Sequence, residues 1–465
     1  MEIDPKLEYK CLIQKAMNFG NKNDILSNLV DISVDEEFWG FLIDQFIWSF
    51  DHNPKDNWNI SDLIIKYCQD MPPPFIGLLI DYIFDHCPRL SWFLWKREFY
   101  SLEVVKESLI KHKKMGSIVF YVKYFPNILD LCMTFPDFHV YKSLISSFSS
   151  QNIEYFEANI ETSWEKNSIG YYIYYDDVDS LMSCGDIPVA YPDEAILMSN
   201  LPDNALAAKY PSWLGVAAYY GSLKCFEYLL LEQSDNIPEA TAPLAYAGGN
   251  IEIVNIVNQQ YSITVDCFIG ALSSRHWDLV SSLKERITNI TSADFIISND
   301  YIGFIDFIRK GNKINAKSEN HFNSGTTMDY SIRMNDLSLL ELCFFEGIPN
   351  KTTPLEAAII SNRLEIVKMV VEKGCSFSAG ISHQAIPHVA NGNIEIFNYL
   401  VSKKNEISFN INGVPIIILF SKLCASLGNW IEQKFFLQRE QIQSMLIFKF
   451  NFFLWKHLFS LCNYW

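Results

Sequence analysis

A short sequence pattern recurs four times, without a gap, in the second half of the chain. Each copy has small or apolar residues suited to a short helix, then one glycine or asparagine, then an apolar–polar–apolar–apolar run that begins a second helix. The copies occupy residues 212–226, 240–254, 353–367 and 383–397. This repeat limits the fold more than any other feature, because a unit of this size buries its apolar face only by stacking on its neighbours.

The single residue between the two expected helices is the most constrained position of each copy. It must adopt a positive φ for the chain to turn sharply, and glycine and asparagine do so most readily. In the four clear copies this residue is Gly221, Gly249, Asn362 and Gly392. Asn335 is a further expected turn, and weaker copies surround Arg275 and Asn299. We therefore expect about seven units.

The repeated residues resemble the ankyrin repeat. The closest copy has Thr-Pro-Leu at 353–355, Ala-Ala at 357–358, Leu-Glu-Ile-Val at 364–367 and a closing Gly374, which match the marks of that family. The copies are also similar to the expanded ankyrin families of unicellular eukaryotes, which carry an uncharacterised helical N-terminal region. The resemblance covers residues 206–412 and implies a solenoid whose concave face binds protein partners.

Several copies depart from the family pattern. Glu356 stands where a histidine usually follows Thr-Pro-Leu, Trp213 replaces the usual proline, and Pro243 lies two places late. The turns are also closer together than the usual ~33 residues, since Gly221 and Gly249 are 28 residues apart. We therefore expect degenerate repeats with short loops.

The chain as a whole is expected to be all-α, with an ankyrin-repeat solenoid preceded by an irregular helical domain. Residues 1–205 are predicted to be a helical N-terminal region of unknown function. Residues 206–412 are predicted to be the degenerate ankyrin repeats. Residues 413–465 are predicted to be a final partial repeat and an aromatic C-terminal cap.

Prolines and acidic residues indicate local structure in the N-terminal region. A helix begins at the three prolines 72–74 and must end near Cys87, because Pro88 follows. The aromatic segment 170–175 is interpreted as strand-like or helical. The acidic segment 176–179 is interpreted as a solvated helix cap, because it lacks the glycine and the distal glutamate of a calcium loop.

Composition disfavours several classes of partner. The net charge of the 465-residue chain is −17, which repels nucleic-acid phosphates and anionic bilayers. Eleven cysteines are spread along the chain without a CxxC pair, and there is no basic and apolar leader, so we expect the cytoplasm or the nucleus. The apolar run 444–465 is interrupted by Lys449, Lys456 and His457, so we expect no membrane-spanning helix.

No set of reactive residues has the spacing that catalysis or metal binding requires. The sequence contains no GxxxxGK[ST], HExxH, GxSxG or GxGxxG motif. His383 and His388 are five residues apart, which does not place them side by side on a helix as a metal-binding pair. We therefore predict no catalytic residue, no cofactor and no metal, and a chain that is not an enzyme.

The candidate partner-binding residues are the two positions before each turn residue, because the rest of the repeat is needed for the turn and the core. They are Tyr219, Tyr220, Ala247, Gly248, Ile360, Ser361, Ala390 and Asn391. The ankyrin resemblance places them on the concave face, and tyrosine is common among interface anchors. For Tyr219 and Tyr220, packing against the N-terminal region is an equal alternative.

The predicted function is that of a monomeric, non-enzymatic scaffold for protein–protein interaction, with protein partners and no nucleic acid. Two alternatives stay open. In the first, residues 1–205 form a catalytic or ligand-binding domain that the repeats deliver to its target. In the second, the C-terminal aromatic segment makes the chain a membrane-peripheral adaptor.

Overall fold

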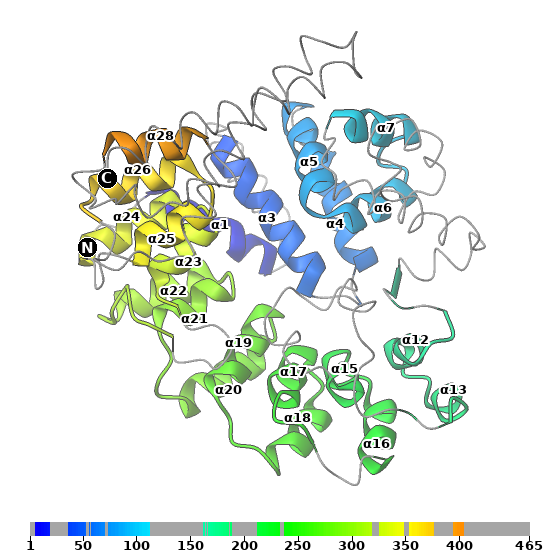
Figure 1. Cartoon of the computed structure of the whole chain (residues 1–465). Helices are drawn as coiled ribbons and strands as arrows, with labels where there is room; N and C mark the ends of the chain where they lie inside the picture. Colours follow the sequence, from blue (N-terminus) through cyan, green and yellow to red (C-terminus); the bar gives the residue numbers. More distant parts are fainter. Residues whose placement is uncertain are drawn as a thin grey trace, which may run out of the picture. The chain divides into compact units, whose positions relative to one another are not determined.

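Helices make up most of the described part of the chain in the computed structural model (Figure 1). That part comprises residues 5–18, 36–52, 55, 57–69, 73–111, 161–162, 164, 166–185, 187, 212–232, 237–318, 325–347, 353–375 and 394–403. No strand of a sheet runs through these residues, and an isolated antiparallel bridge joins Lys317 to Thr326. The predicted all-α class is confirmed.

The chain divides into two units. Unit 1 comprises Met1–Tyr330 and Ser338–Glu346, and unit 2 comprises Ser331–Leu337 and Gly347–Trp465. Residues 205 and 412, the predicted boundaries, lie outside the described residues. So does the segment 413–465, whose interpretations as a cap or a membrane contact stay predictions. Among the described helices, none combines the length and the apolar character needed to cross a bilayer.

Prolines set the helix boundaries early in unit 1. The helices there are α1 (Pro5–Asn18), α3 (Glu36–His52), α4 (Asn57–Cys68), α5 (Pro73–His86), α6 (Pro88–Lys96) and α7 (Leu102–Lys111). Pro73 begins α5, and Pro88 begins α6 directly after α5 has ended. Proline is tolerated in the first turn of a helix and not in its interior. The predicted helix that ends near Cys87 is confirmed.

Aromatic side chains form the core between these first helices. Phe50 of α3 lies against Phe93 of α6, with ring centroids 5.3 Å apart and the rings nearly perpendicular. Trp58 of α4 lies 4.5 Å from the same Phe93 ring. Phe50 and Phe93 are fully buried. Edge-to-face contacts of this kind stabilise the packing beyond the burial of apolar area alone.

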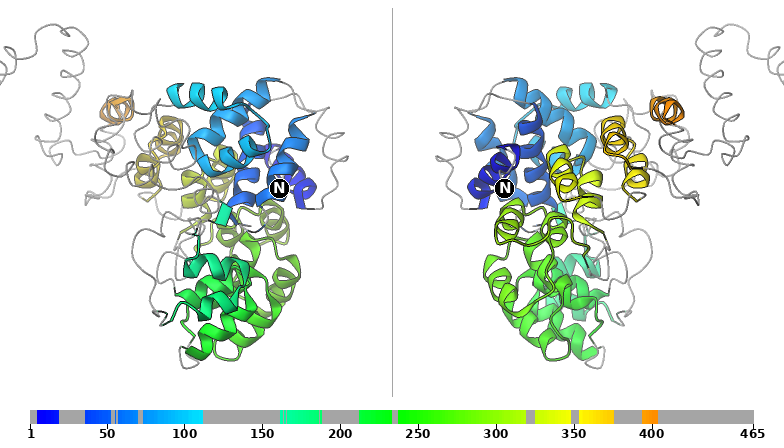
Figure 2. Two further views of the ribbon diagram at one scale, coloured as in Figure 1. Left: turned by 90° about the vertical axis from the view of Figure 1, so that its right-hand side faces the viewer. Right: turned by 90° about the vertical axis from the view of Figure 1, so that its left-hand side faces the viewer.

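Helical hairpins follow in unit 1, and each has two short helices. They are α12 (Ile169–Tyr175) with α13 (Val178–Met182), α15 (Trp213–Tyr219) with α16 (Leu223–Glu232), α17 (Thr241–Gly248) with α18 (Ile251–Asn258), α19 (Val265–Ser273) with α20 (Trp277–Arg286), and α21 (Ser292–Ile297) with α22 (Tyr301–Arg309). The first helices stack in order, α12 on α15, α15 on α17, α17 on α19 and α19 on α21. Figure 2 shows the later of these hairpins in green, beside the blue N-terminal helices.

Further helices continue the pattern toward the C-terminus. They are α23 (Thr327–Arg333), α24 (Leu337–Glu346), α25 (Thr353–Ile360), α26 (Leu364–Glu372) and α28 (Ile394–Ser402). In unit 2, α25 packs against α26, and α26 packs against α28. Gly374, the predicted closing glycine, has a φ of 84° directly after α26.

The predicted turn residues all have the left-handed conformation where they are described. Their φ angles are 62° for Gly221, 71° for Gly249, 58° for Asn335 and 57° for Asn362. Gly392 lies outside the described residues. These four turn assignments are confirmed. The weaker copies also contain a left-handed residue, Arg275 with a φ of 62° and Asn299 with a φ of 52°.

The same backbone hydrogen bond closes the turns at Gly221, Arg275, Asn299 and Asn335. The residue after the left-handed position donates its N–H to a carbonyl five residues earlier, as Ser222 does to Ala217 at 2.9 Å. His276 makes the equivalent bond to Ala271 at 2.9 Å, and Asp336 makes it to Ser331 at 2.9 Å. This bond is the mark of the Schellman motif, which satisfies the carbonyl groups at the end of a helix.

The α12–α13 hairpin was not among the expected units. Asp176 is its left-handed residue, with a φ of 55°, and Asp177 donates its N–H to the Tyr172 carbonyl at 2.9 Å. Asp177 also begins α13, because its side chain accepts the N–H of Ser180 at 3.1 Å. The interpretation of segment 176–179 as a helix cap is confirmed, and the aromatic segment before it is helical.

Two glycines let the stacked first helices approach closely. A Cβ atom on Gly248 would lie 2.0 Å from the carbonyl oxygen of Ala218 on the neighbouring hairpin. A Cβ atom on Gly270 would lie 2.4 Å from the carbonyl oxygen of Pro243. Any side chain at either position would push the helices apart.

We predict that replacing Asn362 by valine destabilises unit 2. Valine does not tolerate the φ of 57° at this position, and the left-handed conformation costs about 1–2 kcal/mol for such a residue. Thermal unfolding should show a lower melting temperature with little change in helix content by circular dichroism. Asn362→Gly is the matched control and should stay close to the wild type. Equal melting temperatures for all three proteins would contradict the assignment.

Candidate functional site

The surface that the sequence assigned to partners lies around the hairpin turns. We name the left-handed residues between the paired helices of the unit 1 hairpins the turn row: Asp176, Gly221, Gly249, Arg275 and Asn299. The first helices stack on one another in sequence order. The turns that end these helices therefore follow one another along one edge of the stack.

A side chain near each turn donates a hydrogen bond to a carbonyl of an adjacent turn. The bonds run from Ser222 to Ile173 at 2.6 Å, from Asn250 to Gly221 at 3.1 Å, from His276 to Ala247 at 2.8 Å and from Arg275 to Asn299 at 2.8 Å. Carbonyl groups at helix ends need such donors, because they have no partner within their own helix. The turn row is therefore a continuous polar ladder.

The contact between His276 and the Ala247 carbonyl determines which nitrogen of the His276 ring carries a proton. A carbonyl oxygen only accepts hydrogen bonds, so the Nε2 atom that faces Ala247 must carry a proton. Burial lowers the pKa of His276, and the bond to the Ala247 carbonyl opposes that shift. The neutral imidazole is therefore sufficient for the contact.

The N-terminal region covers much of the turn row. The Trp48 indole N–H donates to the Ser273 carbonyl at 3.2 Å, and Lys55 donates to the Ser222 hydroxyl at 3.3 Å. Trp164 donates to the Tyr220 hydroxyl at 3.0 Å. The surface that the sequence assigned to outside partners is thus occupied, at several turns, by side chains of the same chain.

Amide side chains recognise the last turn of the row. The Gln14 amide nitrogen donates to the Asn299 carbonyl at 2.5 Å, and the Gln14 oxygen accepts the N–H of Tyr301 at 2.8 Å and that of Ile302 at 3.3 Å. Gln45 donates to the Asn299 side-chain oxygen at 3.0 Å. These contacts satisfy both the end of α21 and the beginning of α22.

Tyr219 and Tyr220 are interior residues. Their exposed fractions are 4% and 5%. The Tyr220 ring lies edge-on to Tyr174 with centroids 5.2 Å apart, and the Lys55 ammonium lies 5.9 Å from the Tyr220 ring centroid. Burial raises the pKa of Tyr220 to about 12. In this arrangement the rings pack against the N-terminal region, which is the alternative interpretation, and a partner cannot reach them.

The other candidate residues have different surroundings. Ala247 and Gly248 are half-buried. The Ala247 carbonyl accepts a hydrogen bond from His276, and the absence of a side chain at Gly248 lets α17 approach α15 closely. Ile360 has an exposed fraction of 46%, and Ser361 is half-buried with its hydroxyl bonded to the Ala358 carbonyl at 2.7 Å. Ala390 and Asn391, like His383 and His388, lie outside the described residues.

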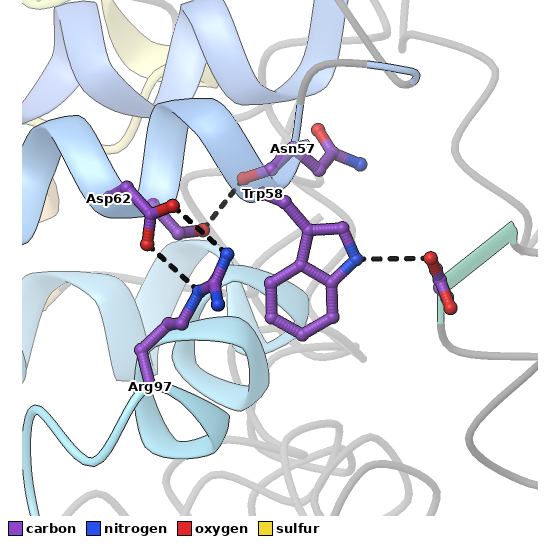
Figure 3. A network of polar contacts seen from close by, with 6 residues as sticks. Asn57, Trp58, Asp62 and Arg97 are labelled. Carbon is purple, nitrogen blue, oxygen red and sulfur yellow. Dashed lines mark hydrogen bonds and ion pairs between the residues drawn. The ribbon is translucent and has the colours of Figure 1, made fainter.

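A second polar cluster joins the early helices, and no sequence motif indicated it (Figure 3). Arg97 pairs with Asp62 through its Nε atom at 2.8 Å and its Nη2 atom at 2.9 Å. The guanidinium group lies 4.7 Å from the Trp58 ring centroid, and the Trp58 N–H donates to Glu161 at 3.0 Å. These contacts tie α4 to the segment after α6 and to residue 161. Their role is structural, because each charged group is engaged by a protein partner.

Neither the known family models nor the curated proteins include a match to this chain. No group of three or more histidine, cysteine, aspartate or glutamate side chains is arranged to hold a metal ion in the described segments. The turn row with its covering side chains is a network of hydrogen bonds between neighbouring hairpins and the N-terminal region.

We predict that Tyr220→Phe destabilises the protein by about 1–2 kcal/mol, because it removes the buried hydrogen bond from Trp164. Tyr219→Phe is the matched control. Among the described residues the Tyr219 hydroxyl is buried and has no hydrogen-bond partner, so its removal should leave stability unchanged or raise it. Urea unfolding followed by tryptophan emission measures both. Equal effects of the two variants would show that the Trp164 contact does not stabilise the protein.

We predict an acid sensitivity that depends on His52. Its ring stacks on Trp48 at 3.9 Å, and burial lowers its pKa to about 4, with a smaller contribution from the Arg275 charge. Between about pH 6.5 and pH 4 the unfolded state binds a proton at His52 more readily than the folded state does. The free energy of unfolding should therefore fall by roughly 3 kcal/mol as the pH falls through this range.

His52→Phe keeps a ring on Trp48 but cannot titrate. The variant should therefore lose less stability than the wild type between pH 7 and pH 4.5. Unfolding midpoints at both pH values test this. The same decrease in both proteins would mean that His52 is not held neutral in the folded state.

Proposed function

We propose that the chain is a non-enzymatic protein-binding scaffold built on degenerate ankyrin repeats. The observation that carries the proposal is the series of helical hairpins with a left-handed residue at each described turn that the repeat pattern indicated. Stacked first helices and Schellman-type turns are what such a repeat requires. The sequence resemblance to ankyrin repeats supports the same assignment.

A stack of hairpins suits protein binding for a physical reason. Each hairpin is fixed by its neighbours, so a long surface is held rigid before any partner arrives. Association then avoids much of the entropy cost of ordering loops. This supports a scaffold rather than a catalyst, as does the lack of a recognised catalytic motif in the sequence.

We place the partner surface in unit 2, around the turn at Asn362. In unit 1 the chain's own N-terminal side chains already contact the equivalent positions. Ile360 instead exposes a large apolar side chain two residues before its turn, at a position the repeat does not need for its core. Ser361 lies beside it. Ala390 and Asn391, the corresponding positions of the next copy, lie outside the described residues.

The partners we propose are proteins with a neutral or basic binding surface. The net charge of −17 disfavours acidic partners and nucleic acids at long range. We propose a monomer in the cytoplasm or the nucleus, because the eleven cysteines are spread along the sequence without a CxxC pair.

We predict that Ile360→Asp weakens partner binding about fivefold or more while the melting temperature is unchanged, because an exposed anchor loses its apolar contact. The full-length chain would capture partners from cells that produce it, and the recovered partner would then be titrated directly. Leu231→Asp is the matched control, because Leu231 is 72% exposed but lies on a second helix far from a turn. Equal affinities of both variants would reject this surface.

A further inference from the structure

Helices α12 and α13 form the first hairpin of the stack that the structure describes. Helix α12 packs chiefly against α13 and against α15 of the next hairpin, and Figure 1 shows α12 and α13 beside α15 and α16. Within the described residues the stack begins here, so no neighbouring hairpin covers the other side of α12. We call four accessible side chains of this hairpin the tyrosine face: Tyr171, Tyr175, Asp177 and Asp179.

The aromatic rings of the tyrosine face are fixed in place by the core. Tyr175 has an exposed fraction of 50%, and its ring lies edge-on to Tyr171 with ring centroids 4.9 Å apart. It also lies edge-on to the buried Tyr174 ring, with centroids 5.1 Å apart. Tyr174 contacts Tyr220 of the next hairpin in the same way. An exposed ring that is already ordered costs little entropy when it anchors a partner.

Carboxylates follow these rings directly in the chain. Asp177 and Asp179 are exposed, and neither makes an ion pair with a lysine or arginine of the described residues. Hydrogen bonds from Ser180 lower the pKa of Asp177, so this carboxyl group is ionised at neutral pH. Burial and the nearby Glu161 carboxylate raise the pKa of Tyr175, so its hydroxyl stays neutral. The tyrosine face therefore combines neutral rings with negative charge.

The chain itself shows how such a combination of groups binds a cation. The Arg97 guanidinium lies 4.7 Å from the Trp58 ring centroid and pairs with Asp62 at 2.8 Å (Figure 3). The Lys55 ammonium lies 5.8 Å from the Tyr174 ring centroid. A ring attracts the cation in both places, and a carboxylate adds an ion pair in the first. The tyrosine face has rings and carboxylates of the same kinds.

We propose that the tyrosine face binds an arginine-rich segment of another protein. Arginine suits this surface better than lysine, because a guanidinium stacks on an aromatic ring and pairs with a carboxylate in a fixed geometry. The net charge of −17 attracts basic segments at long range. The tyrosine face lies in unit 1 and is a second surface beside the one around Asn362. It goes beyond the proposed function and does not depend on it.

The first experiment measures by fluorescence anisotropy how a labelled peptide of Arg-Gly repeats binds to the full-length chain. Citrulline in place of arginine removes the charge and should weaken binding at least about tenfold. Tyr175→Ala should weaken binding at least about fivefold, and Tyr175→Phe, which keeps the ring, should stay within about twofold of the wild type. Phe345→Ala is the matched control, because it removes an 81% exposed ring from α24. It should bind as the wild type does.

A pair of charge variants tests the carboxylates. Asp177→Asn combined with Asp179→Asn should weaken binding of the same peptide at least about threefold, because the ion pairs are lost. Asparagine at residue 177 still caps α13. Glu252→Gln combined with Asp278→Asn is the matched control, because it removes two exposed charges from α18 and α20. Equal weakening by the two double variants would mean that only the net charge attracts the peptide, which would overturn the proposal.

The contact is then located in the wild type with a photoreactive benzophenone on the peptide. Cross-links should concentrate in residues 171–182. No binding, cross-links elsewhere or a folded Tyr175→Ala variant of unchanged affinity would overturn the proposal. Melting temperatures show which variants are folded, and if Tyr175→Ala unfolds, the aspartate variant and the cross-links decide. Ile360→Asp should bind the peptide as the wild type does, so failure here is distinguishable from failure of the proposed function.

Discussion

The left-handed residue between two short helices is the constraint on which the repeated part of this chain depends. It reverses the chain within three residues and so lets the first helices stack directly. Arg275 and Asp176 adopt this conformation although it costs about 1–2 kcal/mol for such residues. Both have compensating contacts: Arg275 donates to the Asn299 carbonyl at 2.8 Å, and Asp176 accepts the N–H of Cys225 at 3.0 Å.

The turns also explain why the N-terminal helices lie where they do. A short helix ends in carbonyl groups without partners in that helix, and buried groups of this kind need donors. Neighbouring turns supply some donors, and Trp48 and Gln14 supply others from distant parts of the sequence. Side chains of the N-terminal region therefore lie against the turn row because they donate hydrogen bonds to its carbonyl groups. The turns that they cover are not exposed to an outside partner.

The turn positions could be predicted from sequence because one residue in each repeat must have a positive φ. That argument alone predicts the turn at Asn335, which has a φ of 58°. Asp176 was missed, because aspartate is common in caps and loops and its hairpin lacks the repeat pattern. For Tyr220 the sequence leaves partner binding and packing against the N-terminal region as equal alternatives, because the pattern fixes its position relative to the turn but not the position of Trp164, which covers it. No periodic signal connects such distant residues.

The identity of each turn residue follows from what lies against it. A Cβ atom on Gly221 would lie 3.2 Å from the Gly248 carbonyl, and one on Gly249 would lie 2.3 Å from the His276 ring. The neighbouring turn leaves no space for a side chain at Gly249 and makes a tight contact at Gly221. At Asn299 the side chain instead accepts a hydrogen bond from Gln45 of α3. The left-handed residue is therefore glycine where a neighbouring turn lies against it, and it has a side chain where that side chain makes a hydrogen bond, as at Asp176, Arg275 and Asn299.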